Sequence, residues 1–437
     1  MRTPLRANRD FRLLWIGQAL SNLGGRISGV AFPLLVLATT GSPAKAGLVG
    51  LAANAPFVLL QLPAGAYVDR WNRRAVMLWA DAGRAMALGS LAVTLAIDQL
   101  YFLHILVVAA VEGSLFVVFR LAEVSAMRQV VPEEAQLADA IALNQARAYG
   151  TSLAGEPLGG LLFVVRPTLP FAADAVSYIA SLVTIMAIRT PLSAPPRTAP
   201  RHLSREIREG LTAAWSNRFL RTTALLTTGS DFVINGLFLI LIVIATSHGA
   251  SPTEVGVMLA LGGAGGMLGA LAAPLLARRI QSLRFIVAGV VWVGVPTVAL
   301  AAATANPILL GLLLGVTLSV WPLYNAIVVS RWMLQIPDRL MGRVQSAVGL
   351  IGWAPVPLAP FLGGLLIESA GEAWTVLTFS AIMLAIALTA TLNRTIHVES
   401  ARAKTANGTF RVNSEDDWTP GRCTPARAAP DVHGLTA

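Results

Sequence analysis

The fold of this chain is decided by the stretch Gly65-Ala66-Tyr67-Val68-Asp69-Arg70-Trp71-Asn72-Arg73-Arg74. It separates two long apolar segments, and its charges are one carboxylate followed by three arginines. Lysine and arginine close to a membrane span resist translocation, so a loop this short and this basic is expected on the cytoplasmic side. The stretch therefore predicts two membrane helices joined by a cytoplasmic loop.

The whole chain has the composition of a membrane protein. Of its 437 residues, 55% are hydrophobic and only 13% are charged, whereas about 25% of the residues of an ordinary soluble domain are charged. Apolar runs of about 20 residues recur along the chain, and each is long enough to cross a bilayer as a helix. The predicted class is therefore an all-α polytopic membrane protein.

Twelve membrane helices are expected, in two pseudo-symmetric halves of six. Short stretches recur in the same order in both halves: Gly159-Gly160-Leu161-Leu162 returns as Gly363-Gly364-Leu365-Leu366, and Ser42-Pro43 returns as Ser251-Pro252. Such duplicated halves bind substrate at the midplane between them. The predicted spans are 12–38, 44–67, 75–97, 101–127, 138–165, 171–189, 221–247, 253–277, 284–304, 307–330, 343–369 and 374–393.

These spans divide the chain into four parts. Residues 1–189 form the first half and residues 221–393 the second. Residues 190–220 form a cytoplasmic linker in which apolar residues at helical spacing predict an amphipathic helix on the membrane surface. Residues 394–437 lack hydrophobic periodicity and are expected to be a disordered cytoplasmic tail. Prolines inside the spans are expected to mark kinks rather than breaks: Pro33, Pro56, Pro157, Pro296, Pro322 and Pro357.

The sequence argues against a nucleic-acid-binding protein, a disulfide-bonded protein and an enzyme. The net charge is +10, but most of the 33 basic residues fall in segments placed in the cytoplasm, which fixes topology and gives no reason for a nucleic-acid partner. The single cysteine, Cys423, allows no intrachain disulfide. No P-loop is present and the five histidines are scattered, so we predict no enzyme activity, no metal and no cofactor.

Several motifs, taken in order, resemble the major facilitator superfamily of transporters. Gly65-x-x-x-Asp69-Arg70-x-x-Arg73-Arg74 is similar to its loop signature, with Asn72 where a second glycine is usual. Other pieces resemble the branch of macrolide-efflux and enterobactin-exporter-like proteins. These pieces are Asn8-Arg9-Asp10-Phe11-Arg12-Leu13-Leu14-Trp15, Leu62-Pro63-Ala64-Gly65, Asp81-x-x-Arg84-Ala85, Asp174-Ala175-Val176-Ser177-Tyr178 and Gly342-Arg343-Val344.

The resemblance implies an exporter that is driven by proton entry and works by alternating access. It also implies that helices one, four, seven and ten line the cavity, so the candidate cavity residues are Asn22, Asn235, Trp321 and Asn325. By the same resemblance, Asp69 faces the start of helix eleven near Arg343, where the positive helix end favours a carboxylate. An arginine of the loop (Arg70, Arg73 or Arg74) would pair with Glu123 and latch the halves. For Arg73 and Arg74, the alternative is that they only anchor the topology.

Charges inside the membrane are costly, so each is a functional candidate. Counted along the helices, Arg26, Glu112 and Glu156 fall at similar depths, so Arg26 can neutralise one acid while the other exchanges protons. A second group lies nearer the cytoplasm, and its member on helix seven, Asp231, is a further proton-coupling candidate. The alternative is that these are static paired charges. The other members of this group are Asp81, Arg84, Arg120, Glu123 and Arg147.

Helix five carries a helix-packing motif made of Gly155, Pro157, Gly159 and Gly160. Exporters of the superfamily usually show Gly-Pro-x-x-Gly-Gly here, whereas this chain reads Gly155-Glu156-Pro157-Leu158-Gly159-Gly160. Small residues let helices approach closely, which suits a sliding interface between the halves. The alternative is ordinary helix packing.

The function predicted from the sequence is export of a small amphipathic molecule (drug, macrolide-like or siderophore-like) by proton antiport. The expected partners are that substrate, protons and the lipid bilayer. The protein is expected to be a monomer in the cell membrane with both termini in the cytoplasm. Two alternatives are an importer of the same fold and a non-transporting membrane sensor or assembly partner that acts through the linker and tail.

Overall fold

The computed structural model describes residues 5–68, 70–131, 134–192, 211–212, 215–279, 292–296, 299, 304–336, 344 and 348–393. Several sequence predictions lie outside these residues. They concern Asp69, Arg343, the tail 394–437, most of the linker 190–220 and most of the predicted span 284–304.

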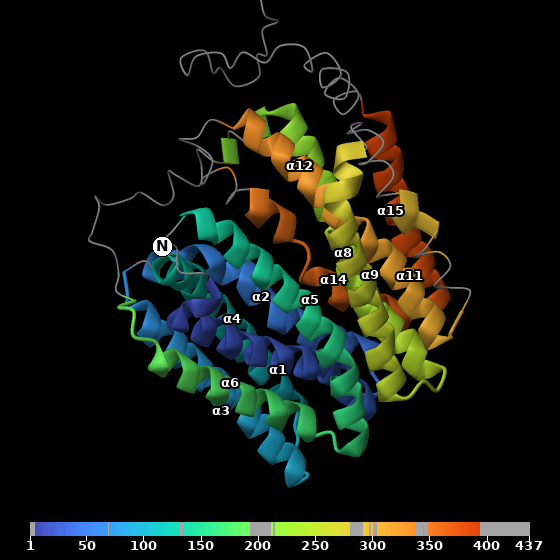
Figure 1. Ribbon diagram of the computed structural model, residues 1–437. Helices are drawn as coiled ribbons and strands as arrows, with labels where there is room; N and C mark the ends of the chain where they lie inside the picture. The colour runs from blue at the N-terminus through green and yellow to red at the C-terminus, as the bar shows by residue number, and fades with distance from the viewer. Residues whose placement is uncertain are drawn as a thin grey trace, which may run out of the picture.

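The described residues form helices and their connections (Figure 1). A short 3-10 helix, η1 (Leu5–Ala7), precedes the first half. We use the name first half for the group α1 (Arg9–Thr40), α2 (Pro43–Val68), α3 (Arg73–Ala96), α4 (Phe102–Val130), α5 (Glu134–Val165) and α6 (Leu169–Ala187). We use the name second half for the group α8 (Arg218–Ser247), α9 (Pro252–Arg279), α11 (Pro307–Ser319), α12 (Trp321–Gln335), α14 (Leu358–Ala370) and α15 (Glu372–Leu392).

Asparagines set where several of these helices begin. The side chain of Asn72 accepts hydrogen bonds from the amides of Arg74 and Ala75, at 3.0 and 3.3 Å, and so caps α3. Asn8, Asn217 and Asn306 cap α1, α8 and α11 in the same way, which satisfies amides that have no partner inside the helix. At the other end of α1, Gly41 has φ +64°, a left-handed conformation that glycine adopts without strain. The sequence therefore fixes these boundaries locally.

Two predicted spans contain a local interruption of the helix near a proline, although each is still found as one candidate membrane span. The predicted helix 307–330 is interrupted at Val320, which separates α11 from α12, and Pro322 lies in the first turn of α12. The predicted helix 343–369 is interrupted by turns at residues 354–357, directly before α14. In both places proline occupies the start of a new helix, where its missing N–H costs no hydrogen bond.

Ten candidate membrane spans are found among the described residues. At 32 residues α5 is long enough to cross a bilayer, but its polar composition keeps it out of these ten. The predicted ninth span lies mostly outside the described residues. The molecule is therefore an all-helical, multi-pass membrane protein, and the total of twelve spans stays a prediction.

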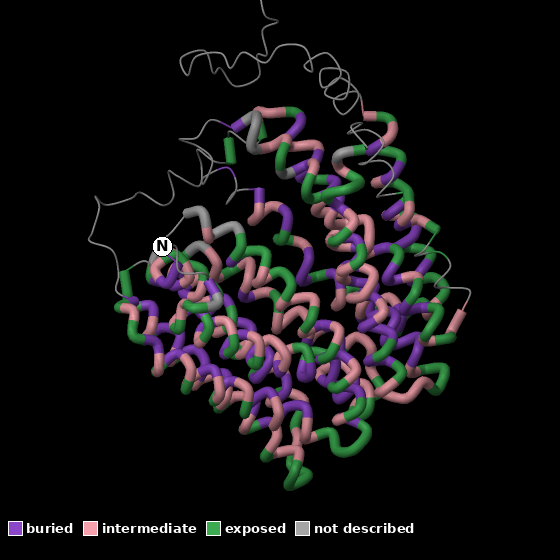
Figure 2. The backbone as a smooth tube through the Cα atoms, in the orientation of Figure 1, coloured by how far each residue is buried: buried purple, intermediate pink, exposed green. Residues whose placement is uncertain are grey.

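The two halves meet along two helix pairs, α5 with α9 and α2 with α14 (Figure 1). We call the end of the bundle that carries residues 70–72 and 188–192 the proximal end, and the end that carries residues 41–42, 166–168 and 248–251 the distal end. The buried core includes apolar side chains of both halves, such as Leu34 of α1 and Leu237 of α8. Figure 2 shows buried residues where helices face each other and exposed residues along the outer faces.

Candidate functional site

The first pair of intramembrane charges lies between α1 and α5. Nη1 of Arg26 is 3.3 Å from Oε1 of Glu156, and Ser152, one turn earlier on α5, donates a hydrogen bond to the same oxygen. The Glu156 side chain is 8% exposed and that of Arg26 is 49% exposed. Within the described part of the chain the second oxygen, Oε2, is buried without a hydrogen-bond partner. Of the two acids proposed for Arg26, Glu156 is the one beside it.

Glu112 lies in a different group, inside the first half. Arg84 of α3 donates to Oε1 of Glu112 through Nη2 at 2.6 Å and through Nε at 3.1 Å. The hydroxyl of Tyr178 donates to the same oxygen at 3.2 Å. Nη1 of Arg84 is also 3.9 Å from Oδ1 of Asp81, which lies one turn earlier on the same face of α3. Glu112 therefore has its own arginine and does not share Arg26.

The sequence analysis missed a further member of this group. Asp174 of α6 is fully buried and accepts hydrogen bonds from Ser28, Ser177 and Tyr178. Its signal was present, since it is an acid inside a predicted span, but it was counted only for its resemblance to a family motif. Two stretches that carried the resemblance, Asp81 to Ala85 and Asp174 to Tyr178, thus lie against each other in the fold.

The hydrogen bonds that the structure shows for Arg74, for the amide of Arg73 and for Glu123 go to other partners. Glu123 instead accepts a hydrogen bond from Nη2 of Arg147 at 3.0 Å. The side chain of Arg74 donates to the carbonyl oxygens of Ile188 and Thr190. The backbone amide of Arg73 donates to the carbonyl oxygen of Leu192 at 3.0 Å. These bonds tie the start of α3 to the end of α6 within the first half. Any role of the loop in latching the two halves stays a prediction, as does the pairing of Asp69 with Arg343.

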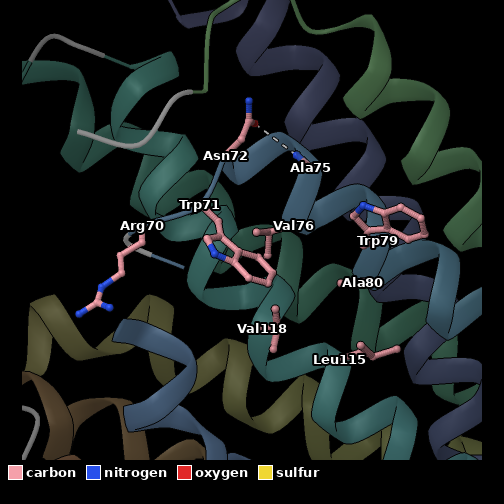
Figure 3. A pocket seen from close by; sticks show the side chains of 9 residues that line it. All are labelled: Arg70, Trp71, Asn72, Ala75, Val76, Trp79, Ala80, Leu115 and Val118. Atoms are coloured by element: carbon pink, nitrogen blue, oxygen red, sulfur yellow. Dashed lines mark hydrogen bonds between the residues drawn. The ribbon is translucent and has the colours of Figure 1, made fainter. Parts of the chain in front are cut away.

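A surface pocket of about 570 Å³ lies beside the loop, between α3 and α4. Figure 3 shows the indole of Trp71 next to Val76 and Val118, while the guanidinium of Arg70 points away from them. Trp79, which also lines the pocket, is strongly exposed. None of the candidate cavity or proton-coupling residues lines this pocket, so it is not the central site.

The glycines of the helix-packing motif face two different neighbours. A Cβ on Gly155 would lie 2.6 Å from the Cβ of Arg26, and one on Gly159 would lie 2.6 Å from the carbonyl oxygen of Ile27, so both pack against α1. Gly160 faces the backbone of Pro252 at the start of α9. Across the same contact, a Cβ on Gly256 would lie 3.0 Å from the Cα of Pro157. The motif therefore builds one contact inside the first half and one between the halves.

The candidate cavity residues lie on α1, α8 and α12. Asn22 is half-buried, the Asn235 amide donates to the backbone oxygen of Asp231 at 2.8 Å, and Asn325 is exposed. The ring of Trp321 is stacked on that of Tyr324, with centroids 5.3 Å apart. Asp231 is half-buried, and its carboxylate has no ion-pair partner among the described residues.

A hydrogen-bonded contact between the halves at the distal end was also missed by the sequence analysis. Glu368 of α14 accepts a hydrogen bond from Oγ of Ser42 at 2.7 Å and from the amide of Ala44 at 3.2 Å. Its carboxylate therefore caps the start of α2, a helix of the other half. Beside it, Gly364 faces the backbone of Pro43. No local sequence signal identifies this contact, because its partners are more than 300 residues apart.

Replacing Glu368 by alanine should weaken the distal contact without unfolding either half. The variant loses both hydrogen bonds between α14 and the start of α2. The fraction of molecules in which the two halves are separated at the distal end should therefore rise several-fold. Labelling of an introduced Ser251→Cys by a membrane-impermeant maleimide, in a Cys423→Ser background, would report this change. Glu372→Ala is the matched control, because Glu372 accepts a hydrogen bond from Ser247 inside the second half. Equal labelling rates in the two variants would show that Glu368 does not hold the two halves together at the distal end.

The described residues form a helical bundle with ten candidate membrane spans, and two of these spans, α3 and α4, are joined by the ion pair of Arg84 with Glu112. The chain belongs to the transmembrane secretion effector family, whose model matches residues 2–415. It is therefore a transporter of the major facilitator superfamily and not an enzyme. Among the described residues no group of three or more His, Cys, Asp or Glu side chains is placed to hold a metal ion.

Curated relatives and solved structures agree with this family. The chain is 28% identical to the multidrug efflux pump Tap of Mycolicibacterium fortuitum, over 86% of this chain and 94% of the relative. It is 22% identical to macrolide efflux protein A of Streptococcus pyogenes, again over 86% and 94%. The fold is similar to that of the nucleoside transporter NupG, with a TM-score of 0.69, 13% identity and 87% and 98% coverage. It is also similar to a bacterial homologue of the human lysosomal transporter Spinster, with a TM-score of 0.67, 12% identity and 93% and 99% coverage.

Proposed function

We propose that this protein exports small amphipathic molecules across the cell membrane in exchange for protons. The observation that carries the proposal is the Arg26–Glu156 pair, a buried acid with an unsatisfied oxygen at the contact between the halves. Its relatives named as multidrug and macrolide efflux pumps support export over import. The family supports transport over a sensor or assembly role.

The orientation follows from the basic residues. Among the described residues arginine is frequent at the proximal end, as at Arg9, Arg70 and Arg74, so we propose that this end and both termini face the cytoplasm. The glycine contacts between the halves lie towards the distal ends of α2, α5, α9 and α14. The structure is thus a state sealed on the outer side. Alternating access then requires the distal contacts to open and the proximal ends to close.

Proton exchange at Glu156 would couple to that movement through two neighbours. Arg26 neutralises the carboxylate from the half-exposed face of α1, and the backbone of Glu156 itself contacts α9 at Gly256. A change in the charge of Glu156 therefore affects both its ion pair with Arg26 on α1 and the contact between α5 and α9. Glu112 and Asp231 remain further proton-coupling candidates. A single protomer contains all these groups, so we propose that the monomer is the working unit.

Export is tested in a host that lacks its own drug pumps, with ethidium and the macrolide erythromycin as probes. Cells that make the protein should accumulate several-fold less of at least one probe than cells with the empty vector. A protonophore should remove that difference within minutes, because the proton gradient drives export. Equal accumulation of both probes, or export that survives the protonophore, would contradict the proposed function.

A further inference from the structure

Four charged side chains lie together inside the first half, apart from the Arg26–Glu156 pair: Asp81 and Arg84 of α3, Glu112 of α4 and Asp174 of α6. We call them the α3–α4–α6 cluster. Asp81 and Asp174 are fully buried, Arg84 is almost so, and the Glu112 side chain is 20% exposed. The cluster lies inside the first half, where three helices contribute one charged group or more.

The arginine of the cluster is held in place on both sides. Its guanidinium lies over the ring of Tyr178, 4.1 Å from the centroid, and over the ring of Phe116 at 5.3 Å. Nε and Nη2 of this guanidinium both donate hydrogen bonds to Oε1 of Glu112. Charge-assisted bonds of this kind are the strong ones. Arg84 is thus committed to Glu112, and its single positive charge balances that carboxylate.

The two aspartates are left without a cation of their own. Among the described residues, the groups within hydrogen-bond distance of the Asp174 carboxylate are the hydroxyls of Ser28, Ser177 and Tyr178, the last two at 3.1 and 3.4 Å. In the described part of the chain neither oxygen of Asp81 makes a well-formed hydrogen bond. The uncharged hydroxyl of Ser181 acts on Asp81, and Nη1 of Arg84 is 3.9 Å away.

The remaining charged groups nearby do not restore the balance. Glu123 of α4 acts on Asp81 with a further negative charge, but it has Arg147 as its own partner. Beside Asp174, the charged groups that act most strongly on it are Arg84 and Glu112, and Tyr178 also interacts with it. The α3–α4–α6 cluster therefore combines three carboxyl groups with one guanidinium.

Three ionised carboxylates would leave a net charge of about −2 in a site with almost no solvent. Burying an uncompensated charge costs several kcal/mol even after relaxation, and a carboxyl group in that position takes up a proton instead. Carboxyl groups that share one site likewise do not all ionise together. We propose that the α3–α4–α6 cluster is a proton-binding site, with at least one proton held on Asp81 or Asp174.

The position of the cluster gives this proton a route and a link to the first site. Glu112, the partly exposed member, is the group through which a proton can enter. Ser28, which donates to Asp174, is two residues after Arg26 on α1. A change of protonation at Asp174 alters that bond and so acts on the helix that carries Arg26. The use of this proton in transport rests on the proposed antiport, whereas its binding does not.

Infrared difference spectroscopy of the purified protein in lipid nanodiscs tests the proposal directly. A protonated carboxylic acid has a C=O stretching band that ionised carboxylates lack and that shifts in D₂O. Subtracting the spectrum of the double variant Asp81→Asn/Asp174→Asn from that of the wild type should reveal this band at neutral pH. Asp139→Asn, which changes an exposed aspartate at the proximal end of α5, should produce no such difference.

An unchanged band in the double variant would overturn the proposal. If the double variant does not fold, the two single variants replace it, and at least one of them must lose the band. The export assay is run in parallel on the wild type. Loss of the band together with absent proton-driven export would refute the proposed function alone, whereas an unchanged band with intact export would refute this inference alone.

Discussion

Replacing Glu156 by glutamine should abolish gradient-driven export while leaving the protein folded in the membrane. Glutamine keeps the size of the side chain and its hydrogen bond with Ser152, but it removes the negative charge next to Arg26. It also removes a carboxylate that can take up and release a proton. We expect export driven by a proton gradient to fall at least about tenfold, which corresponds to ~1.4 kcal/mol in the rate-limiting barrier.

The measurement is export of the responsive probe by inside-out membrane vesicles at matched protein levels. Glu254→Gln is the matched control. Glu254 is an exposed acid near the distal end of α9, and its carboxylate accepts hydrogen bonds from Ser251, which belongs to the same half. The control should transport as the wild type does. Wild-type export by Glu156→Gln under a proton gradient would show that Glu156 does not carry the proton. Asp231, the half-buried acid of α8, would then be the next candidate.

Helix positions were predicted well from the sequence because their ends are set by local chemistry. Asn72 and Asn217 cap helices that follow them directly, and Gly41 ends α1 with a left-handed residue, so a short window contains the whole signal. The breaks at Val320 and at residues 354–357 were missed for the opposite reason. Inside a continuous apolar run, a proline that kinks a helix and a proline that starts a new one look alike.

The pairing of the charges was less predictable, because depth along a helix does not give the direction of a side chain. Arg26, Glu112 and Glu156 were placed at one depth, yet Arg26 contacts Glu156 and Glu112 turns towards Arg84. The direction depends on how the helices rotate and pack, which a single sequence does not reveal. The contact of Glu368 with Ser42 depends further on how the two halves meet.

The largest conformational effect is expected from a side chain at Gly160, where α5 contacts α9. A Cβ at this position would overlap the carbonyl oxygen of Pro252 and would lie 2.8 Å from its carbonyl carbon and 3.0 Å from the Cα of Thr253. All of these atoms are backbone, so no side-chain rotation relieves the overlap. Gly160→Leu must therefore separate α5 from α9 at the distal end, and it should favour the state that opens outward.

Two measurements follow this separation. Export should fall by on the order of tenfold, because a transporter that cannot close the contact between α5 and α9 cannot return to the state that opens towards the cytoplasm. A thiol at Thr253→Cys, in a Cys423→Ser background, should react faster with a membrane-impermeant maleimide than it does when Gly160 is present.

Gly150→Leu is the matched control for this variant. Gly150 lies on the same helix, is exposed, and has no atom within 4 Å of its Cβ position. Leucine there should even favour the helix by roughly 0.8 kcal/mol. The control should leave both readouts at the wild-type level, which separates the effect at the seam from an effect on α5 itself.

The second seam offers an independent check, because Gly364 of α14 faces the backbone of Pro43 as Gly160 faces that of Pro252. Gly159-Gly160 and Gly363-Gly364 are also the stretches that the two halves share in sequence. Gly364→Leu should therefore reproduce the loss of export and the faster labelling. Wild-type export and labelling by both leucine variants would mean that these contacts are ordinary packing that stays closed throughout the cycle.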